Sequence, residues 1–111
     1  MNPTPPNLPP IIQKYLDASN AHAPAAMSAC FAENGVVHDE GEVLEGREAV
    51  RGWAQETKRK YNANLQPTGM TEKEGKTIVT CIVSGKFPGS PISLDFQFTI
   101  SGDEISALSI G

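Results

Sequence analysis

The second half of the chain is a run of short strand patterns, and this run constrains the fold more than any other feature. Apolar and polar side chains alternate from Ile92 to Ile100, with Leu94, Phe96 and Phe98 on the apolar side. This alternation is typical of a strand with one buried face. Further strand patterns cover residues 65–73, 77–87 and 104–110, with turn residues between them. We therefore expect four consecutive strands in an antiparallel meander with one apolar face.

The first half of the chain is predicted to be mainly helical. Apolar residues recur at helical spacing over residues 9–21, and Pro24 begins a second helix that is expected to reach Phe31. A turn at Glu33-Asn34-Gly35 and a short strand, Val36–Asp39, follow. A third helix starts at Gly46. Its inner stripe consists of Ala49, Val50, Trp53, Thr57 and Tyr61.

Helices followed by a run of strands indicate an α+β domain rather than a doubly wound sheet. A sheet with one apolar face must curl over the helices so that both bury their apolar surfaces. We expect a cone-shaped α+β barrel, with three helices packed on a curved, mostly antiparallel sheet and a small-molecule pocket at the open end. Residues 9–111 are predicted to form this single domain. Residues 1–8, rich in proline, are expected to be a flexible lead-in without the features of a signal peptide.

Composition excludes several classes of partner. The net charge of −4 and the pI near 5.0 argue against nucleic acid and anionic membranes, which favour basic faces. No apolar run approaches the roughly 20 residues of a membrane span. Cys30 and Cys81 do not form a CxxC pair, so two free thiols in a cytoplasmic protein are expected, with one disulfide as the alternative. The two histidines lack metal-ligand spacing, and we expect neither a metal nor a cofactor.

The sequence IIQKYLDASNAHAPAAMSACFAENGVVHDEGEVLEGREAVRGW, residues 11–53, resembles the superfamily named after nuclear transport factor 2. That superfamily includes ketosteroid isomerases, SnoaL-like polyketide cyclases and limonene epoxide hydrolases. The resemblance is most specific over Phe31–Asp39 and over the sequence GREAVR at residues 46–51. It covers nearly the whole chain in the order of its elements. It implies the cone-shaped fold with its apolar pocket, and it also implies homodimers.

The resemblance also implies roles for single residues. Tyr15 falls where ketosteroid isomerases carry the tyrosine that donates a hydrogen bond to the oxyanion, and Asp39 falls where they carry the general base. Their second oxyanion donor, a protonated aspartic acid, falls at Phe96, and Asp95 beside it faces the other side of the strand. The resemblance to SnoaL-like cyclases implies a simpler site. In it, one pocket residue such as Asp39 removes a proton next to a carbonyl.

Strand alternation separates the two polar residues at the end of the short strand. Val37 and Asp39 share one face, whereas His38 lies on the other and is expected to be a bystander. We expect Val37, Trp53, Phe96 and Phe98 to line the ligand pocket. The apolar surroundings that these residues provide would raise the pKa of Asp39 and make it a better base. The alternative is that Asp39 only caps a turn with Glu40-Gly41.

Three interpretations of the function remain open at this point. The first is a cofactor-independent isomerase, cyclase or lyase in which Asp39 and Tyr15 move a proton next to a carbonyl of a small hydrophobic substrate. The second is a non-catalytic small-molecule-binding or dimerisation module of the same fold. A partner-binding subunit, a third interpretation, predicts a closed cavity and a large exposed apolar patch. We expect a homodimer through the outer sheet face, which carries Ser93, Asp95, Gln97 and Thr99.

Overall fold

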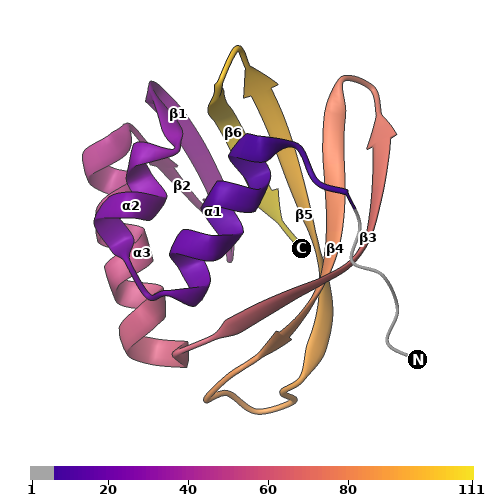
Figure 1. Cartoon of the computed structure of the whole chain (residues 1–111). Coiled ribbons are helices and arrows are strands. Elements are labelled where there is room, and N and C mark those ends of the chain that lie inside the picture. Colours follow the sequence, from indigo (N-terminus) through magenta and orange to yellow (C-terminus); the bar gives the residue numbers. More distant parts are fainter. Residues whose placement is uncertain (1–6) are drawn as a thin grey trace.

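The computed structural model describes residues 7–111, in which three helices and six strands are found (Figure 1). In chain order the elements are α1 (Pro10–Asn20), α2 (Pro24–Ala29), β1 (Phe31–Asp39), β2 (Glu42–Glu45), α3 (Arg47–Tyr61), β3 (Asn64–Lys73), β4 (Lys76–Ser84), β5 (Ile92–Ser101) and β6 (Glu104–Ile110). None of the helices in this part of the chain is long and apolar enough to cross a bilayer. Most of the expected lead-in, residues 1–6, lies outside the described residues, while Leu8 packs against the core.

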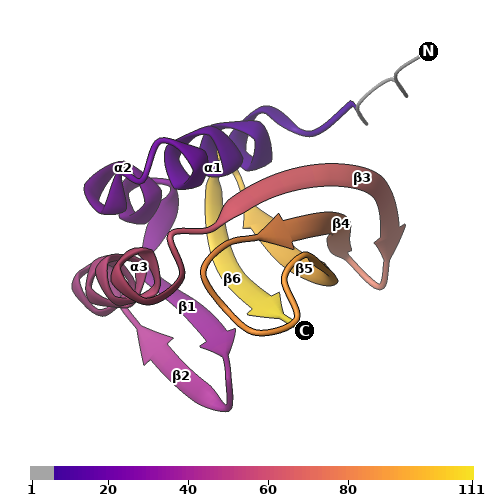
Figure 2. The ribbon, with the colours of Figure 1, turned by 90° about the horizontal axis from the view of Figure 1, so that it is seen from below.

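All six strands form one sheet in the order β2-β1-β6-β5-β4-β3. Neighbouring strands are antiparallel except β1 and β6, which are parallel. Figure 2 shows the sheet bent into an arc, with the three helices gathered on one side of it. The prediction of an α+β fold with helices on a curved, mostly antiparallel sheet is therefore confirmed, and the four predicted strands are β3 to β6.

The region between α2 and the end of β1 differs from the prediction. The second helix ends at Ala29, and Phe31 already belongs to β1, five residues before the expected start of the strand. In the pairing with β6, Phe31 lies opposite Ile105 and Val36 opposite Ala107, so β1 contains a bulge. The expected turn at Glu33-Asn34-Gly35 is this bulged segment. Pairing with a strand some 70 residues away in sequence, which local patterns do not report, decides its structure.

Strand β4 ends earlier than predicted, at Ser84, because Gly85 lies against the end of α3. A Cβ atom at Gly85 would be 2.5 Å from the backbone oxygen of Tyr61. The next amide, that of Lys86, donates a hydrogen bond of 2.7 Å to the same oxygen. This close contact turns the chain out of the sheet. As a result, Phe87 lies in the loop between β4 and β5 rather than in the strand.

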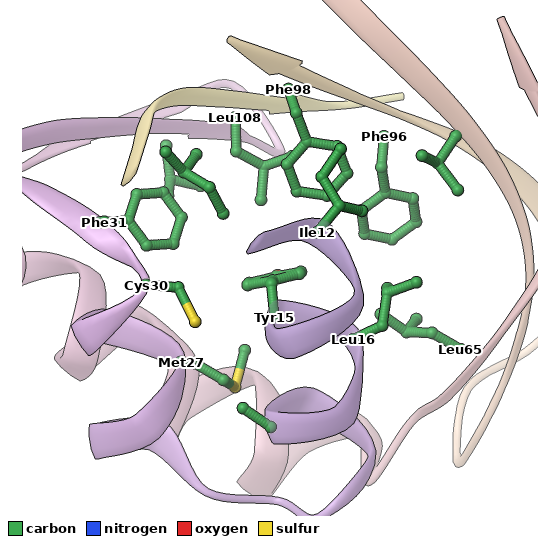
Figure 3. Close-up of a cluster of buried hydrophobic side chains, with 14 of the residues drawn as sticks. Ile12, Tyr15, Leu16, Met27, Cys30, Phe31, Leu65, Phe96, Phe98 and Leu108 are labelled. Atoms are coloured by element: carbon green, nitrogen blue, oxygen red, sulfur yellow. The ribbon is translucent and has the colours of Figure 1, made fainter. Parts of the chain in front are cut away.

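The apolar core lies between the helices and the concave face of the sheet. One face of α1 contributes Ile12, Tyr15 and Leu16, which are all buried. Figure 3 shows Tyr15 at the centre of this cluster. Its ring meets the rings of Phe31 and Phe98 edge-on, at centroid distances of 6.0 and 5.5 Å. These contacts fix the phenol ring of Tyr15 in one orientation.

The two cysteines are buried and do not form a disulfide. Cys30 and Cys81 are both free, which confirms the prediction of two free thiols rather than one disulfide. On the opposite side of the sheet, the side chains that alternate with the core of β5 are more accessible, and Ser93 and Asp95 are exposed. Homodimerisation through this outer face stays a prediction.

Polar contacts attach α1 and α3 to the strands. The Asn20 side chain at the end of α1 forms two hydrogen bonds with the backbone of Leu65 on β3, at 2.9 and 2.8 Å. At the start of α3, Arg47 donates to the backbone oxygen of Phe31 at 2.8 Å and pairs with Glu104 at 2.7 Å. These contacts hold α1 and α3 in place relative to the sheet and thereby fix the separation of the two helices.

Candidate functional site

A cavity of about 480 Å³ lies between the helices and the concave side of the sheet. This volume is in the range of small-molecule sites. Most of its lining is apolar, with polar groups from Tyr15, Asp39, Glu40 and a few hydroxyls. The lining residues are Tyr15, Ser19, Met27, Asp39, Glu40, Trp53, Thr57, Tyr61, Ala63, Leu65, Val83, Phe87, Pro88, Ile92, Leu94, Phe96 and Ile110.

Asp39 is the last residue of β1, and its carboxylate lies on the cavity wall. The indole N–H of Trp53 on α3 donates a hydrogen bond of 3.0 Å to Oδ2 of Asp39. Partial burial raises the pKa of Asp39 above its usual range, and the charge of neighbouring Glu40 raises it further. The hydrogen bonds from Trp53 and from the backbone N–H of Glu40 act in the opposite direction. The environment therefore favours a carboxylate that accepts protons more readily than one in water.

Tyr15 brings a phenol to the same cavity from the opposite wall-forming helix, α1. Within residues 7–111 no hydrogen bond from its hydroxyl is found, and the carboxylates of Asp39 and Glu40 accept from Trp53 and Tyr61 instead. Every fully enclosed polar side-chain atom of the described residues has a hydrogen-bond partner. Because the Tyr15 hydroxyl has none, it is not fully enclosed and retains access to the cavity space. Burial raises the pKa of Tyr15, and the charge of Asp39 raises it further. The group is a neutral hydrogen-bond donor at neutral pH.

One stripe of α3 forms part of the cavity wall. Trp53, Thr57 and Tyr61 follow one another at intervals of four residues, which places them on one face of the helix. The hydroxyl of Tyr61 donates a hydrogen bond of 2.6 Å to Glu40, and its ring meets Phe87 edge-on at 5.8 Å. We call Glu40, Tyr61 and Phe87 the mouth group. Helical spacing predicted Tyr61 on the inner stripe of α3, whereas no sequence pattern indicated that Glu40 or Phe87 would line the cavity.

Four of the six site residues predicted from the sequence line the cavity, namely Tyr15, Asp39, Trp53 and Phe96. Val37 and Phe98 do not line it, which corrects the prediction for these two residues. Both are fully buried in the core. Alternation identifies which face of a strand a side chain lies on, but not how far along the strand the cavity extends. The cavity reaches only the last residue of β1.

The remaining polar candidates lie outside the cavity. His38 is exposed and is absent from the lining, as strand alternation predicted. Asp95 lies on the outer face, where its carboxylate accepts a hydrogen bond of 2.7 Å from Thr80. In the described part of the chain, no group of three potential metal ligands comes together. The chemistry that this cavity can support rests on the carboxylate of Asp39 and the phenol of Tyr15.

Comparison with known families identifies the domain. A sequence profile of the SnoaL-like domain matches residues 12–104. The chain belongs to the SnoaL-like domain family. A crystal structure of a candidate polyketide cyclase from Sinorhizobium meliloti is similar to this SnoaL-like chain with a TM-score of 0.90 and 36% sequence identity. The alignment covers 95% of this chain and 96% of that protein. The resemblance drawn from residues 11–53 is confirmed.

More distant structures share the fold of this SnoaL-like domain. A protein with a ketosteroid isomerase-like fold from Catenulispora acidiphila, solved in complex with trimethylamine, has a TM-score of 0.83 at 21% identity and covers 95% of this chain and 86% of its own. A candidate polyketide cyclase from Xanthomonas campestris has a TM-score of 0.76 at 20% identity, with coverage of 90% and 85%. At this identity the likeness concerns the fold alone. A search of curated proteins found no match.

Proposed function

We propose that this SnoaL-like domain is a cofactor-independent isomerase or cyclase that acts on a small, largely apolar carbonyl compound. The observation that carries this proposal is the presence of Asp39 and Tyr15 on the walls of one cavity of about 480 Å³. One is a partly buried carboxylate with a raised pKa, and the other is a buried, neutral phenol. The 36% identity to a candidate polyketide cyclase supports the same class of reaction.

The reaction begins with proton transfer to Asp39. The carboxylate removes a proton from the carbon next to the substrate carbonyl, and the electrons of that C–H bond move to the carbonyl oxygen to form an enolate. Tyr15 donates a hydrogen bond to this oxygen as its negative charge develops. In an isomerisation, protonated Asp39 returns the proton to another carbon. In a cyclisation, the enolate carbon instead attacks a second carbonyl of the same substrate, and the new alkoxide takes the proton from Asp39.

Trp53 positions the base in this scheme. Its indole N–H occupies Oδ2 of Asp39 at 3.0 Å, which leaves the other carboxylate oxygen for the substrate. The bond also opposes the desolvation that raises the pKa of Asp39. The base thus remains ionised over a wider pH range while its orientation is fixed from α3.

One observation favours a second function, binding without catalysis. Phe96 occupies the lining at the position where ketosteroid isomerases carry their second oxyanion donor, so Tyr15 would stabilise an enolate alone. A ligand-binding module of the same fold needs only the apolar walls. The cavity itself supports either of these functions over a partner-binding subunit, for which a closed cavity is expected.

A ligand screen separates the two functions. Aromatic polyketides, steroids and short enones are tested by thermal shift against the native chain and Asp39→Asn, which keeps the shape of the side chain and an oxygen for Trp53. Asp95→Asn, on the outer face, is the matched control. The proposal predicts compounds that bind all three proteins and are converted by the native chain and the control only. Binding to all three proteins without conversion by any of them would establish the binding module.

A further inference from the structure

The cavity ends in a set of contacts that the proposed proton transfer does not use. Two consecutive carboxylates, Asp39 and Glu40, each accept a hydrogen bond from an aromatic side chain of α3. The partner of Asp39 is Trp53, and the partner of Glu40 is Tyr61, two helical turns further along. Glu40 is exposed, so its charge lies where the cavity meets the solvent. Phe87 completes this end by its edge-on contact with the Tyr61 ring.

The charges of the lining have one sign. Its titratable side chains are Tyr15, Asp39, Glu40 and Tyr61, whose ionised forms are all negative. Among the described residues, the lining includes neither lysine, arginine nor histidine. A carboxylate or phosphate in this cavity would lose its hydration and meet only like charges, which is unfavourable. The lining therefore selects against anionic ligands and favours neutral or cationic ones.

The mouth group adds a positive preference for cations. Cations such as alkylated ammonium groups are attracted to the faces of aromatic rings, and the attraction grows when the site is partly shielded from water. Tyr61 and Phe87 both line the cavity, and the hydroxyl of Tyr61 is bonded to the carboxylate of Glu40. Aromatic rings beside a carboxylate are the combination that recognises a substituted ammonium group. A neutral ligand would need only the apolar part of the cavity.

We propose that the ligand of this cavity carries a positively charged nitrogen, an alkylated or protonated amine, which binds at the mouth group beside Glu40. Its uncharged, carbonyl-bearing body extends towards Tyr15. This inference rests on the cavity being the ligand site of the proposed function, but it does not require that Asp39 act as a base. Glu40 is the counter-charge in this proposal because it is exposed and bonded to Tyr61, whose ring packs against Phe87.

Three probes that share a phenol ring test the charge preference. They are (3-hydroxyphenyl)trimethylammonium, its neutral counterpart 3-tert-butylphenol, and the anion 3-hydroxybenzoate, measured by isothermal titration calorimetry. We expect the cation to bind the native chain about tenfold more tightly than the neutral probe, as cation–aromatic attraction together with one carboxylate allows. The anion should bind more weakly than either.

Two variants assign the preference to the mouth group. Glu40→Gln keeps an oxygen for the Tyr61 hydroxyl and removes the charge, so the fold is expected to remain intact, as checked by circular dichroism. It should weaken binding of the cation about threefold to fivefold and leave the neutral probe unchanged. Glu42→Gln removes a charge two residues away, outside the lining, and should change neither affinity.

Several outcomes would overturn the inference. These are equal or tighter binding of the neutral probe or the anion, equal loss for all probes in Glu40→Gln, a loss of equal size in Glu42→Gln, and no binding of the cation at millimolar concentration. The proposed function is tested separately, since Asp39→Asn should retain the preference for the cation while it abolishes turnover. If the preference is found but no substrate is converted, only the catalytic proposal fails.

Discussion

The substitution Tyr15→Phe separates a catalytic phenol from a structural one. The ring of Tyr15 is buried and packs against Phe31 and Phe98, and phenylalanine can make the same contacts. The hydroxyl, however, forms no hydrogen bond within residues 7–111, and Tyr15 lines the cavity. Its removal therefore takes away no bond that holds the fold. We expect the stability of the variant to match or exceed that of the native chain.

The size of the expected contrast follows from general magnitudes. A hydroxyl with a buried partner contributes about 0.5–1.5 kcal/mol to the free energy of unfolding. In a domain of this size each kcal/mol corresponds to a change of about 4–8 °C in Tm. A structural hydroxyl would therefore cost several degrees, whereas we expect no decrease in Tm. If Tyr15 is the only side-chain donor to the enolate oxygen, its removal should reduce kcat about 10²- to 10³-fold.

Two measurements on the same protein samples decide the matter. Thermal unfolding gives Tm, and turnover of a compound identified by the ligand screen gives kcat. Asp95→Asn, on the outer face of the sheet and outside the cavity lining, is the control for turnover. A clear decrease in Tm for Tyr15→Phe would show that the hydroxyl has a structural partner. Unchanged kcat would remove Tyr15 from the mechanism.

Three further predictions concern the residues around the cavity. Trp53→Phe removes a hydrogen bond that lowers the pKa of Asp39, so this pKa should rise further. The acidic limb of the pH–rate profile should then move to higher pH. An unmoved limb would exclude Trp53 as a positioning residue. Asn20→Ala removes two hydrogen bonds to the Leu65 backbone and should lower the free energy of unfolding in urea by about 1–2 kcal/mol, whereas no change would mean that water replaces them. Asp39→Asn should raise Tm at neutral pH, because the folded chain holds the Asp39 proton to higher pH than the unfolded chain does. The stability that this proton contributes is complete below the ordinary pKa of 3.8 and is lost as the pH rises through the raised pKa of the folded chain. The advantage of the variant should shrink as pH falls towards 3.8, and an advantage that grew on acidification would contradict the raised pKa.

Local patterns predicted the parts of the fold that local forces decide. Strand β5 alternates cleanly between apolar and polar residues, and the third helix has a continuous inner stripe, so both were found nearly to the residue. Strand β2 was missed because its four residues, Glu42–Glu45, are mostly exposed and carry no apolar face. The start of β1 was missed because its pairing with β6 is a contact between distant parts of the sequence.

The candidate site was predicted in part for a similar reason. Asp39 and Tyr15 were found through the resemblance to a family, since neither residue type is distinctive by itself. Glu40 follows the predicted strand and was expected only as part of the turn Glu40-Gly41, without a role in the cavity. Its backbone has a φ of 52°, in the left-handed region, which ends the alternation at this residue. The side chain can thus reach Tyr61, and strand periodicity contains no signal for this change.

Deuterium exchange measures the transfer of a proton between a ligand and Asp39 without knowledge of the final product. A carbonyl compound that binds the cavity is incubated in D₂O with the native chain, and loss of the proton signal next to its carbonyl is followed by NMR. The account predicts exchange with the native chain and with Asp95→Asn, and none above background with Asp39→Asn, although all three bind the compound. Equal exchange rates for Asp39→Asn and the native chain, or no exchange with any of them, would contradict it.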